Sequence, residues 1–506
     1  MSDANKEELR HRGRRAAGHA VIVMASRVLG MPLAIVSILL YTRIIKPSEL
    51  ALIPITQMLT QLCYTISNMG MGLYVQRRMP EANETDPHAA MLMGRAMMAV
   101  MVVPLILCCL AMAATSELLA GTFLKDRQAG NLVILMIPAV LAICWQTAVT
   151  QVMRSTFLFV KLSVYSLLAQ ILQPAAVIGL YLYWGTTGLV LGLASGAVLF
   201  GLLATWNVRR YLFGKVSVKY MWQLVKQSCP FYGEDYAGYL FGYADQWIVG
   251  LLMTPSDLAV YYIPRSIFAR LSVLMDGLDD VVLATFSATS SRGIEAISKV
   301  FEIVRRLFTY LYVPLCLFFA SASFFLIDLL GGPEYQAGTI PLVLLCILLL
   351  VRGLFGPHAM GVMTLVTPRA RFAVILLQGI TALVAMIPLM YLFGLSGVPA
   401  ARVIAGIIGG LVSSCILRRL FSFSFDRHVI RVLLLPSLLL LIICLGGQLL
   451  FYHRLVVPLY LAMGLAAYAY FFVRLITDSD VKTMDTLLPS RLAWVPTLIR
   501  RWRPAN

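Results

Sequence analysis

Long runs of apolar residues recur along the whole chain, and they constrain its fold more than any other feature. A run of about eighteen or more apolar residues is long enough to cross a bilayer as a helix. Hydrophobic residues make up 60% of the 506 positions and charged residues 13%, whereas soluble proteins carry about 25% charged residues. The sequence therefore predicts an all-α polytopic membrane protein.

The apolar runs predict fourteen membrane-spanning helices. The first run is about 25 residues long, too long for the apolar part of a signal peptide, and no small-x-small cleavage site closes it. We therefore expect it to be retained as the first span. The predicted spans are 20–45, 50–75, 91–114, 130–152, 163–184, 186–208, 227–252, 256–288, 304–330, 338–362, 372–393, 397–417, 430–452 and 455–476.

Lys and Arg residues are distributed unevenly between the two faces of the predicted bundle. If the amino terminus lies inside, few of the 41 basic residues face outward, namely Arg43, Lys46, Lys125, Arg127 and Arg454. Most of the others fall in inner loops, which is the positive-inside pattern. It predicts that both termini lie in the cytoplasm. This topology explains the net charge of +17. The expected partners of the basic residues are anionic lipid headgroups and not nucleic acid.

Two short motifs occur twice with almost the same offset. Pro47-Ser-Glu-Leu-Ala51 returns 208 positions later as Pro255-Ser-Asp-Leu-Ala259, and Gly185-Thr-Thr-Gly188 returns 209 positions later as Gly394-Leu-Ser-Gly397. Because six predicted spans separate the copies, both run in the same direction through the membrane. The duplication predicts two parallel six-helix lobes, a plan in which transporters rock one half against the other around a central path. Pro and the acidic residue suit a helix N-terminus, so we expect the first motif to be structural.

Charge and hydropathy predict the organisation of the chain along its length. The inner loop from Arg77 to Asp86 and the segments 209–226 and 477–506 are basic, and the last two mix basic with aromatic residues as interfacial segments do. Gly188, Gly192 and Gly196 form a face on which another helix can approach closely. The expected parts are a cytoplasmic tail 1–19, an N-lobe 20–208, a linker 209–226, a C-lobe 227–417, two further spans within 418–476 and a cytoplasmic tail 477–506.

Several arginines lie inside predicted spans. A charged side chain at the bilayer centre costs about 2.5–3.5 kcal/mol on insertion scales, so each needs a partner, a cavity or a function. Arg27, Arg265, Arg270 and Arg352 are the candidates for a cationic cavity, since guanidinium groups bind phosphate bidentately. The alternative is a set of structural ion pairs. Arg27 shifted by 208 positions falls on Asp235, which makes Arg27–Asp235 one such pair.

Acidic residues and a proline in the same region are candidates for coupling or gating. Asp235 and Asp245 lie on the seventh predicted span, and Asp276 lies near the inner end of the eighth. Pro264 directly precedes Arg265 and removes a helical hydrogen bond, so it is either a fixed kink or a hinge. The sequence indicates no cofactor or metal site, and it leaves open whether a coupling ion, H⁺ or Na⁺, is used.

Several segments resemble the polysaccharide transporters of the multidrug/oligosaccharidyl-lipid/polysaccharide exporter superfamily. Ala25-Ser-Arg-Val-Leu-Gly30 and Tyr41-Thr-Arg-Ile-Ile-Lys-Pro-Ser-Glu-Leu50 resemble the family's first span and first outer turn. Tyr243-Ala-Asp-Gln-Trp-Ile-Val-Gly250 resembles the start of its second lobe, although Gln246 stands where Arg is often found. Arg402 falls in a stretch that usually has small residues. The resemblance covers residues 20–420.

The resemblance implies a MATE-like fold and a flippase for undecaprenyl-diphosphate-linked oligosaccharide repeat units, acting in the synthesis of O-antigen, capsule or exopolysaccharide. Its partners would include a polysaccharide polymerase and chain-length proteins. A MATE-like cation or drug antiporter remains an alternative, because Asp235 and Asp245 could serve as cavity carboxylates. A membrane polysaccharide polymerase or ligase is a further alternative. Such enzymes typically need a long outer loop, and the longest predicted here is 115–129.

Overall fold

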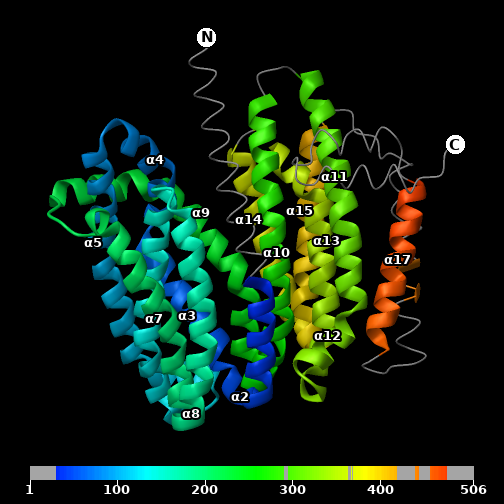
Figure 1. Ribbon diagram of the computed structural model, residues 1–506, viewed down its shortest axis with the longest axis horizontal. Coiled ribbons are helices and arrows are strands. Elements are labelled where there is room, and N and C mark those ends of the chain that lie inside the picture. Colours follow the sequence, from blue (N-terminus) through cyan, green and yellow to red (C-terminus); the bar gives the residue numbers. More distant parts are fainter. Residues whose placement is uncertain are drawn as a thin grey trace. The chain divides into compact units, whose positions relative to one another are not determined.

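The computed structural model describes residues 30–289, 294–362, 366, 368–418, 439–440, 442–443 and 456–475. Every regular element in these ranges is a helix (Figure 1), which confirms the all-α fold class. The chain divides into a first unit, Met1–Tyr262, and a second unit, Ile263–Asn506.

Helix α3 lies at the centre of the first unit. It packs against α5, α7 and α9, and 78% of its apolar window is buried, against 33% for α5. Two of its hydroxyl groups are satisfied within the helix, since Thr56 donates to the carbonyl of Leu52 and Ser67 to that of Cys63. After a helix at Gly30–Ile44, the elements are α2 (Pro47–Leu50), α3 (Leu52–Asn68), α4 (Met71–Thr85), α5 (Pro87–Ala114), α6 (Ser116–Phe123), η1 (Arg127–Ala129), α7 (Gly130–Ser155), α8 (Phe159–Leu212) and α9 (Val218–Leu252).

The segment expected to be an inner loop is helix α4. Met69 and Gly70 take left-handed conformations, with φ of 47° and 73°, and they turn the chain between α3 and α4. Asp86 ends α4 and caps α5, where its side chain accepts hydrogen bonds from the backbone of His88 and Ala89. A capping aspartate of this kind satisfies orphan N–H groups at the helix start. The charges of this segment therefore lie on a helical surface.

Helix α8 is a hairpin whose two arms meet at glycines. Gly185 has φ of 59° and breaks the helix. A Cβ at Gly188 would overlap the carbonyl oxygen of Leu180, and one at Gly196 would come within 2.8 Å of Gln173. Only glycine permits this approach of the two backbones. The predicted close-approach face is therefore confirmed, and it packs against the preceding arm of the same hairpin.

The second unit repeats this hairpin at the predicted offset. Gly394 has φ of 58°, and a Cβ at Gly397 would overlap the carbonyl oxygen of Leu389. Leu389 lies 209 positions after Leu180, as Gly397 does after Gly188. The turn, the glycine and its carbonyl neighbour thus recur together. The second motif therefore marks the same hairpin turn in both units, which supports the duplication.

Helix α13 connects the helices of the second unit, since it packs against α11 and α15. Helices α11 and α12 form one bent pair with an angle of 57°. The elements are α10 (Pro255–Thr289), which begins in the first unit, α11 (Ile294–Ser321), α12 (Ser323–Leu330), η3 (Pro333–Gly338), α13 (Thr339–Gly361), α14 (Pro368–Phe393), η5 (Gly394–Ser396), α15 (Gly397–Arg418) and α17 (Val457–Leu475). The ends of α13, α14 and α15 agree with the predicted spans within a few residues.

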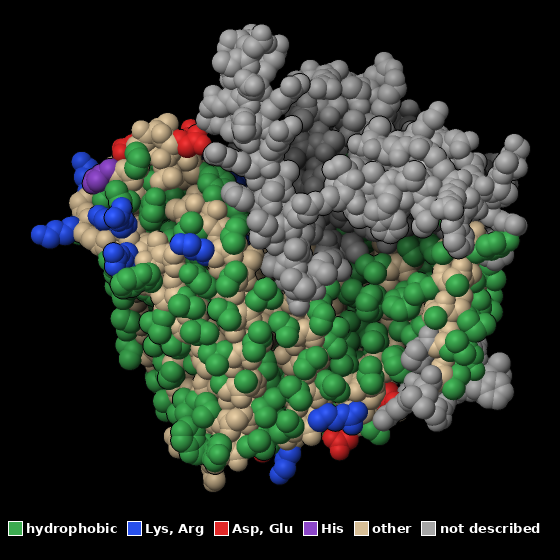
Figure 2. Space-filling view, in the orientation of Figure 1, with side chains coloured by type: hydrophobic (Ala, Val, Ile, Leu, Met, Phe, Trp, Pro, Cys, Tyr) green, Lys and Arg blue, Asp and Glu red, His purple; other side chains and the backbone are tan. Residues whose placement is uncertain are grey.

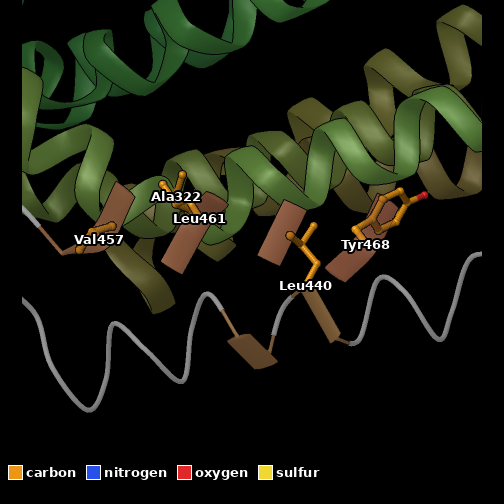
Figure 3. Packing of buried hydrophobic residues seen from close by; sticks show 5 residues of the cluster. All are labelled: Ala322, Leu440, Val457, Leu461 and Tyr468. Carbon is orange, nitrogen blue, oxygen red and sulfur yellow. The ribbon is translucent and has the colours of Figure 1, made fainter. Parts of the chain in front are cut away.

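Helix α17 packs on the bent pair through a small apolar cluster (Figure 3). Val457, Leu461 and Tyr468 from α17 are buried with Ala322, which lies between α11 and α12, and with Leu440. Partly buried Phe and Leu side chains of α11 and α12 surround them. The last predicted span therefore has a defined packing partner within its own unit.

The helices have the length and composition of a multi-pass membrane protein. In the described ranges six helical segments are long and apolar enough to cross a bilayer, or seven if the bent pair counts as one span. Two of them, 159–212 and 370–418, each contain a hairpin and are long enough for two crossings. On the visible face of the first unit hydrophobic side chains cover the middle, and Lys and Arg gather toward the ends (Figure 2). The total of fourteen spans stays a prediction, because several predicted spans lie partly outside the described residues.

We expect Gly188→Ala to lower the free energy of unfolding by about 1–3 kcal/mol, because the added methyl group is forced into the facing backbone. Gly179→Ala is the matched control, since a Cβ at Gly179 meets no atom within 4 Å and alanine favours the helix. Thermal unfolding of both purified variants in detergent would compare them. Equal melting temperatures would contradict the close packing of the hairpin.

Candidate functional site

Four tyrosines form a row along α9. Tyr232, Tyr236, Tyr239 and Tyr243 follow one another at helical spacing, so they share one face. Their ring centroids lie 6.0, 6.5 and 5.6 Å apart in that order. Tyr239 is buried, whereas Tyr236 is 43% exposed. This tyrosine row presents aromatic faces together with hydroxyl groups, a combination suited to polar ligands with flat apolar sides such as sugars.

Polar contacts join α9 to the centre of the first unit. The side-chain amide of Asn68, the last residue of α3, donates to Asp235 at 2.8 Å and accepts from the backbone N–H of Gly72 at 2.9 Å. Tyr239 donates to the carbonyl of Met58 at 3.4 Å and accepts from Trp247 at 2.6 Å. Asp235 was expected opposite Arg27, which lies outside the described residues. In the structure Asp235 accepts a hydrogen bond from Asn68, a partner that the 208-residue offset does not predict.

Asp245 is fully buried and hydrogen-bonded through both carboxylate oxygens. One oxygen accepts from the Tyr261 hydroxyl at 2.9 Å, and the other from the backbone N–H of Gln246 at 3.0 Å. Both Asp245 and Tyr261 have 0% exposure. A buried carboxylate is costly unless hydrogen bonds compensate it. The contact ties α9 to the first turns of α10.

Two arginines of the second unit lie over the same aromatic ring. The guanidinium carbon of Arg265 is 5.5 Å from the ring centroid of Phe268, and that of Arg402 is 5.7 Å from it. Arg265 is on α10 and Arg402 on α15, so the ring brings together helices distant in sequence. Cation–π contacts of this kind stabilise guanidinium groups in partly desolvated surroundings. We refer to Arg265 and Arg402 as the arginine pair.

The other candidate residues are placed as follows. Pro264 is buried just before Arg265 on α10, and Arg270 is exposed further along the same helix. Arg352 is half-buried on α13. The side chain of Asp276 lies outside the described residues, as does Arg27. Within the described part of the chain no three His, Cys, Asp or Glu side chains are grouped as a metal site requires.

Sequence reasoning missed two features of these sites. Arg402 is not among the candidate cations predicted from the sequence, and its partner ring, Phe268, lies on another helix. The tyrosine row was visible as spacing of 4, 3 and 4 residues, and counting aromatic residues at helical intervals would have found it.

Comparisons with known proteins match both the sequence and the fold of this chain. The family model described as "Polysaccharide biosynthesis protein" matches residues 17–276, and no curated protein matches the chain. Solved structures match despite low identity. The lipid II flippase MurJ, in an inward closed conformation, is 13% identical, with a TM-score of 0.71 and coverage of 93% of this chain and 99% of MurJ.

Two MATE transporters match less closely. An inward-facing multidrug resistance MATE family transporter of the MOP superfamily is 15% identical, with a TM-score of 0.55 and coverage of 80% of this chain and 100% of that one. The eukaryotic MATE transporter AtDTX14 is 10% identical, with a TM-score of 0.53 and coverage of 83% and 97%. The fold is therefore like that of these membrane transporters, as the sequence resemblance implied. Because the family model covers more than half of the residues, this chain belongs to the polysaccharide biosynthesis protein family.

Proposed function

We propose that this protein is a flippase that moves polyprenyl-diphosphate-linked oligosaccharide repeat units across the bacterial inner membrane. The product would serve O-antigen, capsule or exopolysaccharide synthesis, and both termini would lie in the cytoplasm. Membership of a polysaccharide biosynthesis family supports the sugar-containing cargo. The likeness to MurJ, whose name assigns it lipid II, supports a lipid-linked one.

The arginine pair is the observation that carries this proposal. Counting from the helix starts at Pro255 and Gly397, Arg265 lies about 15 Å and Arg402 about 8 Å along the helix axis, within the depth of the hydrocarbon core. A diphosphate offers several oxygens for bidentate hydrogen bonds to guanidinium groups. We propose that the pair binds the diphosphate, with Arg27, Arg270 and Arg352 as further cations along the path.

Alternating access would couple binding to movement of the cargo. In this proposal Pro264 gives α10 a flexible point directly before Arg265. Asp235, Asp245 and Asp276 would respond to a coupling ion, H⁺ or Na⁺, and no cofactor would be needed. A polymerase and chain-length proteins would use the translocated units.

A cation or drug antiporter is the second candidate function, and the burial of Asp245 favours it. A fully buried carboxylate at the junction of α9 and α10 is the kind of group that exchanges protons or cations in transporters. The fold likeness to MATE transporters is compatible with this alternative.

Deletion of the gene tests the proposed function directly. We expect lipid-linked single repeat units to accumulate on the inner leaflet, because they are made there and cannot cross. Mass spectrometry of extracted lipid intermediates, with leaflet assignment by a membrane-impermeant sugar label in spheroplasts and inverted vesicles, measures this. Increased sensitivity to cationic dyes without such accumulation would favour the antiporter.

We expect Arg265→Ala and Arg402→Ala each to reduce surface polysaccharide by about tenfold or more, since losing a charge-assisted hydrogen bond costs about 1.5–3 kcal/mol. Membrane levels should stay normal. Arg209→Ala is the matched control, because Arg209 also lies over an aromatic ring, that of Trp206 at 4.6 Å, but at the end of α8. Wild-type polysaccharide in Arg265→Ala would remove Arg265 from the site.

We expect Asp245→Asn to abolish ion-driven translocation while the protein stays folded, because asparagine keeps the acceptor for Tyr261 but cannot carry charge. Tyr261→Phe should do the opposite, lowering stability by about 1 kcal/mol with transport retained. Repeat-unit translocation in cells and thermal unfolding in detergent separate the two effects. Full transport by Asp245→Asn would leave Asp245 with a structural role alone.

A further inference from the structure

The first unit contains a polar cavity beside helix α4. Its volume is about 850 Å³, within the range of sites that bind small molecules. We call it the α4 cavity. Helices α4, α5 and α9 form its walls, with the lining residues Tyr74, Arg77, Arg78, Glu81, Ala82, Thr85, Met93, Gln227 and Phe231.

Aromatic and cationic groups are held together on one side of this cavity. The guanidinium carbon of Arg77 lies 4.9 Å from the ring centroid of Phe231. The Tyr74 ring is 6.2 Å from the same ring, at an interplanar angle of 60°. The Tyr74 hydroxyl donates to Gln227 at 2.6 Å, which connects α4 to α9 across the cavity. Arg77 is thus positioned by Phe231 with its N–H donors available to an anion in the cavity.

The second arginine of the cavity has only a weak internal partner. Arg78 and Glu81 form an ion pair at 3.4 Å, and their side chains are 62% and 69% exposed. Exposed ion pairs contribute little to stability. A phosphate group, which binds guanidinium more strongly than one exposed carboxylate, can therefore displace Glu81 from Arg78. The cavity then offers two guanidinium groups to one anionic ligand, beside an aromatic ring.

The position of the α4 cavity supports a role in receiving the cargo. Charged side chains gather on the visible face at the end of the first unit where α4 lies (Figure 2), and the distribution of basic residues predicts that this end faces the cytoplasm. Phe231 directly precedes Tyr232, the first member of the tyrosine row. The cavity and the row therefore begin at the same turn of α9.

We propose that the α4 cavity is a docking site for the diphosphate-sugar headgroup of the lipid-linked cargo before translocation. This inference rests on the proposed function and adds a site separate from the arginine pair. Arg77 and Arg78 bind the diphosphate, and Phe231 and Tyr74 pack against the first sugar. The lipid chain stays in the surrounding membrane.

Site-specific photocrosslinking tests the docking site. Full-length protein carrying a photoreactive amino acid at Met93, which lines the cavity but makes none of the proposed contacts, is placed in nanodiscs of phosphatidylethanolamine and phosphatidylglycerol. The probe is farnesyl-diphosphate-linked N-acetylglucosamine. We expect mass spectrometry to find the probe attached at position 93. Arg77→Ala should reduce this yield about tenfold, and Phe231→Leu, which removes the ring beside the Arg77 guanidinium, should reduce it several-fold.

Two controls make the result specific. A photoreactive group at Leu202, which lines an apolar cavity of about 400 Å³ on the same unit, reports unspecific capture of lipids. Arg209→Ala removes an arginine with a comparable ring contact outside the α4 cavity and should leave the yield at position 93 unchanged.

Three outcomes would overturn the docking site. They are equal yields from wild-type protein and Arg77→Ala, equal probe capture at positions 93 and 202, and preferential capture of phosphatidylglycerol at position 93, which would make the cavity a phospholipid site. The proposed function can survive each of these, because it fails only if the deletion strain accumulates no lipid-linked units.

Discussion

Close approach of helix backbones is the constraint on which the rest of this structure depends. In a bilayer the helices gain little from burying apolar surface against each other, so contact must come from packing and small residues. Gly188 against Leu180 and Gly397 against Leu389 show the same solution in both units. Each hairpin turns at a glycine with positive φ and closes at a second glycine. Each hairpin packs against a neighbouring helix of its own unit, α8 against α7 and α15 against α13.

Helix α9 differs from these glycine hairpins because polar side-chain contacts join it to its neighbouring helices. Asn68 joins it to α3 and α4, and Asp245 joins it to the start of α10 through Tyr261. Polar groups in a membrane protein are expensive when they have no partner, so such contacts define one position for the helix. This leaves the tyrosine row in a fixed register relative to the α4 cavity. A rigid aromatic surface next to a cationic cavity suits a cargo with both sugar and phosphate parts.

The division of charge between the units has a mechanistic meaning within the proposed function. The arginine pair belongs to the second unit, and the α4 cavity belongs to the first. A cargo received at one and bound at the other would pass between groups of similar chemistry, so neither step requires a large change in binding free energy. The likeness to MurJ and to MATE transporters at 10–15% identity shows that this helix layout tolerates extensive change in side chains.

The sequence by itself determined the helical class, the limits of α13, α14 and α15, and the repeated glycine hairpin, because hydropathy and glycine spacing are properties of neighbouring residues. It did not reveal that the charged segment after α3 is helix α4, since the turn at Met69 and Gly70 has no hydropathy signal. Only the tertiary structure decided which side chains meet. Asn68 and Asp235 are separated by 167 positions, and the residues of the arginine pair come from different helices. Such contacts depend on how helix faces pack in three dimensions, which no local pattern records.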